Sequence, residues 1–176
     1  MNTHWILGAD ALALAIVAAV LDVRQHRIPN WLTYPGIIMG ICLRWAFFGW
    51  RGLGSALSGC LLAGGIVFLF YVVRAMGAGD VKLLAAIGSL VGPSQAVTVL
   101  LATAISGGIL ALIYALTRRR LLATLKSVGS VLQFHAWAGL QVHPVANLDN
   151  PSALRMPYGL AIATGTLYAF VLNLWR

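Results

Sequence analysis

The sequence predicts an all-α, polytopic membrane protein with about six transmembrane helices. Its 176 residues are 60% hydrophobic and only 9% charged, whereas soluble domains average about 45–50% apolar and about 25% charged residues. A helix needs roughly 20 apolar residues to cross the hydrocarbon core. Apolar segments of about this length follow one another along the chain, separated by short polar connections. We therefore expect one integral membrane domain, residues 1–176, surrounded by the lipid bilayer.

The expected membrane segments begin and end where polar, Gly or Pro residues interrupt the apolar runs. In order, they are residues 5–21, 31–48, 55–73, 80–91, 96–116 and 158–175. Pro29 resists a continuous helix after the first segment, and a short turn is expected at residues 51–54. Gly36 and Gly40 have the GxxxG spacing that lets helices approach closely in a bilayer. The run 80–91 is short, so it needs a tilt or an extension to span.

Residues 121–155 differ from the rest of the chain. Leu121, Leu125, Val128 and Leu132 recur at helical spacing with polar residues between them. This pattern predicts an amphipathic helix lying in the cytoplasmic interface. Residues 141–155 contain Pro and Asn residues typical of an irregular loop.

The basic residues predict the orientation of the chain. The net charge of +8 is best explained by the enrichment of Lys and Arg in cytoplasmic loops, so we expect no nucleic acid partner. With the N-terminus outside, nine of the twelve basic residues fall at the cytoplasmic side: Arg24, Arg27, Arg74, Lys82, Arg118, Arg119, Arg120, Lys126 and Arg155. Both termini are then outside, and the cytoplasmic side also receives Asp22 and Asp80.

These two aspartates are the candidate chemical groups. The chain has four Asp and no Glu, and a carboxylate at a membrane boundary is costly enough to indicate function. Peptide hydrolysis by two carboxyls needs one ionised group to activate water and one protonated group to donate to the carbonyl oxygen. Such groups titrate as a coupled pair. The sequence therefore predicts an Asp22/Asp80 dyad.

The stretch around Asp80 suits this role. Gly77 and Gly79 are expected to let the backbone bend tightly and a peptide approach. Lys82 stands two positions after Asp80, so the two side chains do not share a helix face. We expect Lys82 to line the substrate path or to anchor to headgroups rather than to pair with Asp80.

The same residues resemble a known family. Gly77-Ala78-Gly79-Asp80 resembles the GxGD signature of the bacterial type IV prepilin peptidases, and residues 22–30 resemble that family's first-aspartate motif. Residues 156–161 resemble a motif that opens the last helix. The resemblance implies an aspartic endopeptidase that removes the basic leader of prepilins at the cytoplasmic face of the bacterial inner membrane. Prepilin would be its partner, with Asp22 and Asp80 catalytic.

Further residues are expected at the site, and the resemblance also indicates a subtype. The residues expected to bind substrate or shape the loops are Gly77, Gly79, Lys82, Pro29, Asn30 and Tyr158. The long family members carry a cysteine-paired zinc insert and also N-methylate the new terminus. The connection after the first segment is too short for that insert. We therefore expect a compact Tad/Flp-type peptidase without methyltransferase activity, metal or cofactor.

Other interpretations remain open at this point. Intramembrane carboxylates also move protons and cations, so the alternative is a small proton- or ion-coupled transporter component. A noncatalytic membrane assembly protein is a third hypothesis. Asp10 lies about 18 Å from Asp22 along a straight helix and is expected to be structural. For His26, a solvated loop residue is favoured over a partner of the dyad.

Overall fold

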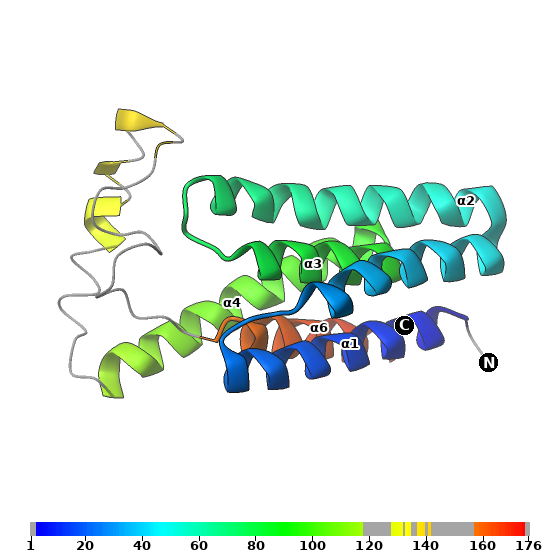
Figure 1. The fold of residues 1–176 in the computed structure, drawn as a ribbon, viewed down its shortest axis with the longest axis horizontal. Helices are drawn as coiled ribbons and strands as arrows, with labels where there is room; N and C mark the ends of the chain where they lie inside the picture. The colour runs from blue at the N-terminus through cyan, green and yellow to red at the C-terminus, as the bar shows by residue number, and fades with distance from the viewer. Residues whose placement is uncertain are drawn as a thin grey trace.

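The structure is a computed structural model that describes residues 3–117, 128–131, 133–134, 137–139, 141 and 157–174. Regular structure within these ranges is helical throughout (Figure 1). The longer helices are α1 (Thr3–Gln25), α2 (Asn30–Val72), α3 (Ala78–Val91), α4 (Pro93–Thr117) and α6 (Gly159–Leu174). The predicted all-α class is confirmed.

The chain reverses direction inside α2, which supplies two of the predicted membrane segments. Gly49 interrupts the helix with φ 59° and ψ −144°, a conformation that is accessible almost only to glycine. The two limbs of α2 run antiparallel on either side of this residue (Figure 1). The turn expected at residues 51–54 was misplaced, because helical structure resumes directly after Gly49.

Glycines let α3 pack closely against α2. A side chain on Gly40 would collide with Ser89 and Leu90, and one on Gly59 would collide with the backbone of Gly88. Close backbone approach of this kind is how small residues hold helices together in a bilayer. The close contact predicted from the GxxxG spacing in this segment is therefore confirmed.

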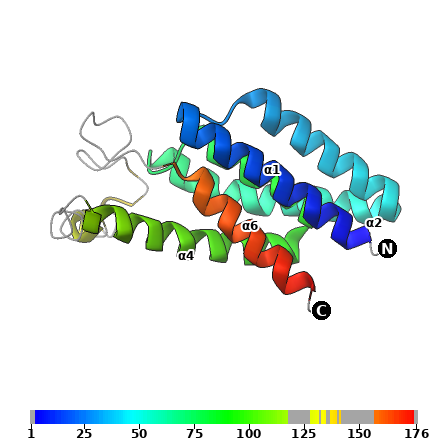
Figure 2. The same cartoon turned by 90° about the horizontal axis from the view of Figure 1, so that it is seen from below.

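The remaining helices surround a shared apolar core. α6 lies between α1 and α4 (Figure 2), and α3 packs against α1 as well as α2. The core combines large buried side chains from each of the longer helices with small residues such as Ala63: Leu7, Leu14, Val67, Leu83, Leu84, Ile87, Leu90, Val99 and Ile162.

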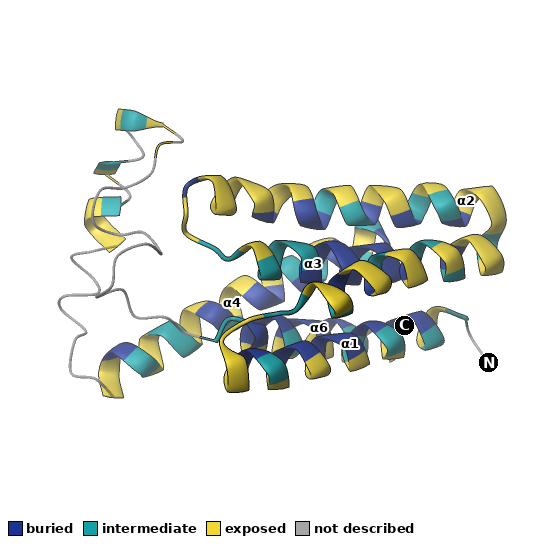
Figure 3. Ribbon diagram, viewed as in Figure 1, coloured by how far each residue is buried: buried dark blue, intermediate teal, exposed yellow. Residues whose placement is uncertain are grey.

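The outer surface of this bundle is also apolar. Exposed residues cover the outside of the bundle (Figure 3). Many of them are large and hydrophobic, among them Leu61 at 73% and Ile105 at 65% exposure. Within the part of the chain that the structure describes, three helices, α1, α2 and α4, are long and apolar enough to cross a membrane. An apolar surface of this extent is favourable in lipid and unfavourable in water. The chain is a polytopic membrane protein.

Two details go beyond the expected segments, and two further predictions fall mostly on residues that the structure does not describe. α1 continues to Gln25, so Asp22 lies in its last turn and the connection to α2 shrinks to residues 26–29. Arg44 is buried, and its Nη1 donates to the carbonyl oxygen of Leu90 at 2.8 Å, where a cation suits the C-terminus of α3. The predicted interfacial helix of residues 121–132 and the loop 141–155 lie mostly outside the described residues.

Candidate active site

Three helix ends meet at one end of the bundle. The last turn of α1, the first turn of α3 and the start of α6 lie at the same end, opposite to the marked chain termini (Figures 1 and 2). Asp22 belongs to the first of these ends and Asp80 to the second. The fold thus brings both predicted aspartates to one end of the molecule.

Asp22 is held by the start of α6. Only 8% of its surface is exposed, and its Oδ2 accepts a buried hydrogen bond of 2.8 Å from the backbone N–H of Gly159. Buried carboxylates need such donors to offset the loss of water. The carboxyl is therefore oriented by a residue 137 positions further along the chain.

Gly159 leaves the space that this contact requires. A Cβ on it would lie 3.0 Å from both Cβ and Oδ2 of Asp22, and 3.1 Å from Cα of Ala19. Residues 156–161 were quoted for their resemblance to a family motif, but Gly159 itself was not predicted as a site residue. Sequence offers only a weak signal for it, because Pro-Tyr-Gly also suits an ordinary helix start.

Asp80 occupies the first turn of α3, outside the three helices that are long enough to span. Its Oδ2 accepts a hydrogen bond of 3.2 Å from the Gly77 N–H. Burial raises the pKa of Asp80 to about 7, the nearby Asp22 carboxylate raises it as well, and the Gly77 hydrogen bond opposes the rise. The Asp22 carboxylate is thus near enough to Asp80 to act on it electrostatically.

Gly77 and Gly79 shape the site by providing space. Gly77 has φ −76° and ψ 148°, an extended conformation open to any residue, and Gly79 lies inside α3. Neither glycine provides the tight bend expected of it. A Cβ on Gly77 would lie 3.1 Å from Asp80 Oδ2, and one on Gly79 would lie 3.0 Å from Ile28 Cβ. The missing side chain of Gly77 leaves room for the Asp80 carboxyl, and that of Gly79 leaves room for Ile28 of the α1–α2 connection.

Lys82 connects α3 to the start of α2. Its Nζ donates to Asn30 Oδ1 at 2.9 Å and stands 4.8 Å from the centre of the Tyr34 ring. Pro29 precedes the first residue of α2 in an extended conformation. The ammonium group of Lys82 thus contacts Asn30 and Tyr34 of α2 and not Asp80. A junction beside the site is formed by Pro29, Asn30 and Lys82.

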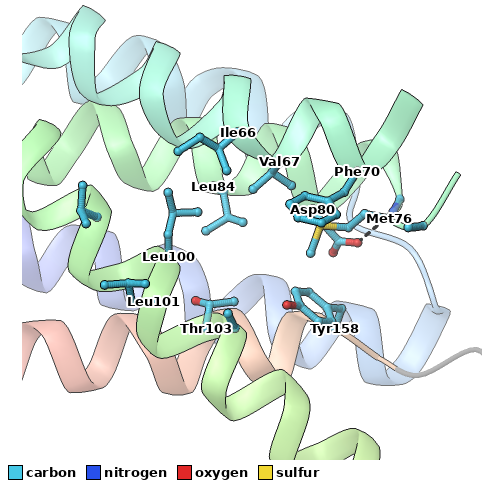
Figure 4. A pocket seen from close by; sticks show the side chains of 14 residues that line it. Ile66, Val67, Phe70, Met76, Asp80, Leu84, Leu100, Leu101, Thr103 and Tyr158 are labelled. Atoms are coloured by element: carbon cyan, nitrogen blue, oxygen red, sulfur yellow. Dashed lines mark hydrogen bonds between the residues drawn. The ribbon is translucent and has the colours of Figure 1, made fainter. Parts of the chain in front are cut away.

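An apolar cavity of about 630 Å³ opens beside Asp80 (Figure 4). Its walls come from the second limb of α2, the α2–α3 loop, α3 and α4, and Tyr158 contributes its phenol ring. Burial raises the pKa of Tyr158, and the Asp80 carboxylate raises it further. Tyr158 therefore faces Asp80, while its neighbour Gly159 holds Asp22.

Two other polar residues of α1 and its connection stand apart from the carboxyls. Asp10 is half-buried earlier in the same continuous helix as Asp22. His26 is exposed and has φ 51°. Its ring Nδ1 lies 3.1 Å from the backbone oxygen of Asp22. His26 therefore contacts the Asp22 backbone at the end of α1.

Residues 11–112 match the type IV leader peptidase family, Peptidase_A24. The chain belongs to this family. The match contains both Asp22 and Asp80 and ends before Tyr158 and Gly159, so the α6 side of the site lies outside it. The predicted family is confirmed.

Curated members of the type IV leader peptidase family are similar to this chain. A prepilin leader peptidase/N-methyltransferase of Burkholderia pseudomallei (strain 1026b) is 32% identical over 114 residues, which cover 61% of this chain and 37% of that protein. A type 4 prepilin-like proteins leader peptide-processing enzyme of Escherichia coli O78:H11 (strain H10407 / ETEC) is 32% identical over 135 residues, covering 70% of this chain and 48% of that protein. The chain thus spans less than half the length of these relatives. No solved structure matches it.

Proposed function

We propose that this chain is a membrane-embedded aspartic endopeptidase that removes the leader peptide from type IV prepilins, with Asp22 and Asp80 as its catalytic pair. The observation that carries the proposal is that the last turn of α1, with Asp22, and the first turn of α3, with Asp80, lie at the same end of the bundle, where the Asp22 carboxylate raises the pKa of Asp80. A pair that shares a site in this way holds one proton between two groups near neutral pH. Membership of a leader peptidase family supports the same chemistry.

Hydrolysis then proceeds without a covalent enzyme intermediate. The ionised carboxylate takes a proton from water as the water oxygen bonds to the scissile carbonyl carbon. The protonated carboxyl gives its proton to the carbonyl oxygen. When the C–N bond breaks, the leaving nitrogen takes the proton that came from water, and a hydroxyl proton of the tetrahedral carbon returns to the other carboxyl. Both carboxyls end in their starting states, and one water has been consumed.

The cavity beside Asp80 fits a substrate whose apolar segment begins at the cut. Its walls are apolar side chains such as Ile66, Phe70 and Leu101, and Asp80 and Tyr158 are its titratable lining residues (Figure 4). A peptide that enters this space has its apolar side chains buried against these walls and its backbone beside the carboxyls. We propose that the start of the prepilin's apolar helix binds here.

The basic residues of the chain favour an active site at the cytoplasmic face of the bacterial inner membrane. Arg24 lies in the last turn of α1, Arg27 in the α1–α2 connection, and Arg74 just after the second limb of α2. All three therefore belong to the end of the bundle that carries Asp22 and Asp80. Basic residues are enriched on the cytoplasmic side. The proposed topology therefore has the active site toward the cytoplasm and both termini outside.

The short α1–α2 connection favours the compact Tad/Flp-type subclass. Only residues 26–29 join α1 to α2, which leaves no space between these helices for a zinc-binding insert. We propose leader peptidase activity without N-methylation.

Cleavage of a type IV prepilin by the purified full chain, reconstituted in liposomes, tests the proposed function. We expect wild type to cut at the leader junction, and Asp22→Asn and Asp80→Asn to lose at least about 10²-fold in rate, as expected for removal of a general acid or base. Asp10→Asn is the matched control, since Asp10 is a half-buried carboxyl of α1 away from the site. Cleavage that persists in either site variant would refute the dyad. Ion flux without cleavage would instead favour the transporter hypothesis.

A further inference from the structure

The contact between Gly159 and Asp22 gives the two carboxyls different surroundings. Asp22 accepts a buried hydrogen bond of 2.8 Å from the first residue of α6. Backbone N–H groups at a helix start carry partial positive charge and stabilise an anion. Asp80 lines the cavity and accepts a longer hydrogen bond of 3.2 Å, from the Gly77 N–H.

We propose that Gly159 is a positioning residue, whose backbone N–H holds Asp22 as the carboxylate that takes a proton from water and so leaves Asp80 as the carboxyl that protonates the substrate. This inference rests on the proposed peptidase function. It is consistent with the raised pKa of Asp80, which favours its protonated form near neutral pH. It also agrees with the close approach of α6 to Asp22, where a Cβ on residue 159 would lie only 3.0 Å from Oδ2.

Among the residues that the structure describes, few other titratable groups face this contact. Asp80 comes from α3, and Tyr158 precedes α6 with its pKa raised by burial and by Asp80. His26 contacts the backbone oxygen of Asp22 and not its carboxyl. Lys82 is bonded to Asn30 at the start of α2. The pH dependence of the site is therefore set chiefly by the two carboxyls as a pair.

Two substitutions of Gly159 distinguish the effect of its N–H donor from the effect of its missing Cβ. Gly159→Ala keeps the N–H but adds a Cβ at 3.0 Å from Asp22 Oδ2. Gly159→Pro adds the same Cβ and also removes the N–H, at a helix position where proline is tolerated. Gly8→Ala is the matched steric control, because Gly8 packs α1 against Phe170 of α6, with a Cβ approach of 2.8 Å, without contacting Asp22.

Prepilin cleavage by each full-length variant is measured from pH 4 to 9 in detergent. The thermal unfolding of each variant is measured in that detergent as well. We expect Gly159→Pro to have kcat/KM about 10- to 100-fold below Gly159→Ala, from loss of a hydrogen bond to a charged group. The acidic limb of its profile moves to higher pH, because protonating the carboxylate no longer breaks that bond. Gly159→Ala moves the limb in the same direction by less, and Gly8→Ala lowers only the unfolding temperature.

Each outcome bears on a different claim. Equal profiles for Gly159→Pro and Gly159→Ala would overturn the positioning role while leaving the peptidase intact. If the proline variant does not fold, Gly159→Ala decides alone, because an unmoved acidic limb would overturn the inference. Absence of cleavage by the wild-type chain would refute the proposed function and this inference with it. That result differs from failure of the positioning role alone, in which the wild-type chain still cleaves prepilin.

Discussion

Gly79 in the first turn of α3 lies directly against Ile28 in the α1–α2 connection, so that a Cβ on the glycine would be 3.0 Å from Cβ of the isoleucine. This approach brings the connection that follows Asp22 against the turn that carries Asp80. The two aspartate motifs are thus joined by packing, and the space left by one glycine sets their separation.

Replacing Gly79 by alanine tests this packing. We expect Gly79→Ala to destabilise the protein by about 1–3 kcal/mol, as overpacked sites do, and to lower kcat/KM because the Asp80 turn is pushed from Ile28. The measurements are thermal unfolding in detergent and cleavage of prepilin. Gly65→Ala in α2 is the control, because open space surrounds Gly65. Equal behaviour of the two variants would show that the approach to Ile28 is not required.

The raised pKa of Asp80 predicts how activity depends on pH. If Asp80 is the proton donor, cleavage must fall as the pH rises through about 7, where burial and Asp22 place the pKa of this carboxyl. At lower pH, the second carboxyl becomes protonated and the rate falls again, which gives a bell-shaped profile that belongs to the pair. A kcat/KM profile from pH 4 to 9 checks this, and activity that keeps rising above pH 8 would contradict it.

The junction of Lys82 and Asn30 predicts an energetic coupling between α3 and α2. Lys82→Met removes the bond to Asn30 Oδ1 but keeps the aliphatic stem over Tyr34. Lys82→Met and Asn30→Ala should each cost stability, and the double variant should cost less than their sum by about 0.5 kcal/mol. Thermal unfolding of the four proteins measures this coupling. Strict additivity, with KM raised only by Lys82→Met, would instead indicate that Lys82 contacts the substrate.

The turn at Gly49 predicts a position where alanine is harmful without any steric contact. Its φ of 59° with ψ −144° is strained for residues with a Cβ, although nothing lies within 4 Å of the added atom. Gly49→Ala should destabilise the protein by about 1–3 kcal/mol. Gly54→Ala, five residues later and equally uncrowded, should be neutral or stabilising, since helical glycine is costly. Comparison of their unfolding temperatures decides.

Several features could be predicted because they follow from local composition. The apolar runs specify helices and a membrane environment, and Pro29 and Gly92-Pro93 mark where helices end. The turn in α2 was misplaced by only a few residues, since Gly49, Gly52 and Gly54 lie close together and are equally good turn signals. The end of α1 was misplaced because Asp22, polar in sequence, is accommodated inside a helix by a distant backbone donor.

Residue types and spacings along the chain were sufficient to predict the membrane class, the family resemblance and the two aspartates as the groups to examine. What surrounds those aspartates depends on the packing of distant segments and became visible in the folded structure. Gly159 meets Asp22 across 137 positions, and Asp80 faces an apolar cavity whose walls come from α2, α3 and α4. Hydrogen bonds and burial between segments so far apart depend on how the helices pack, and no local pattern encodes that packing.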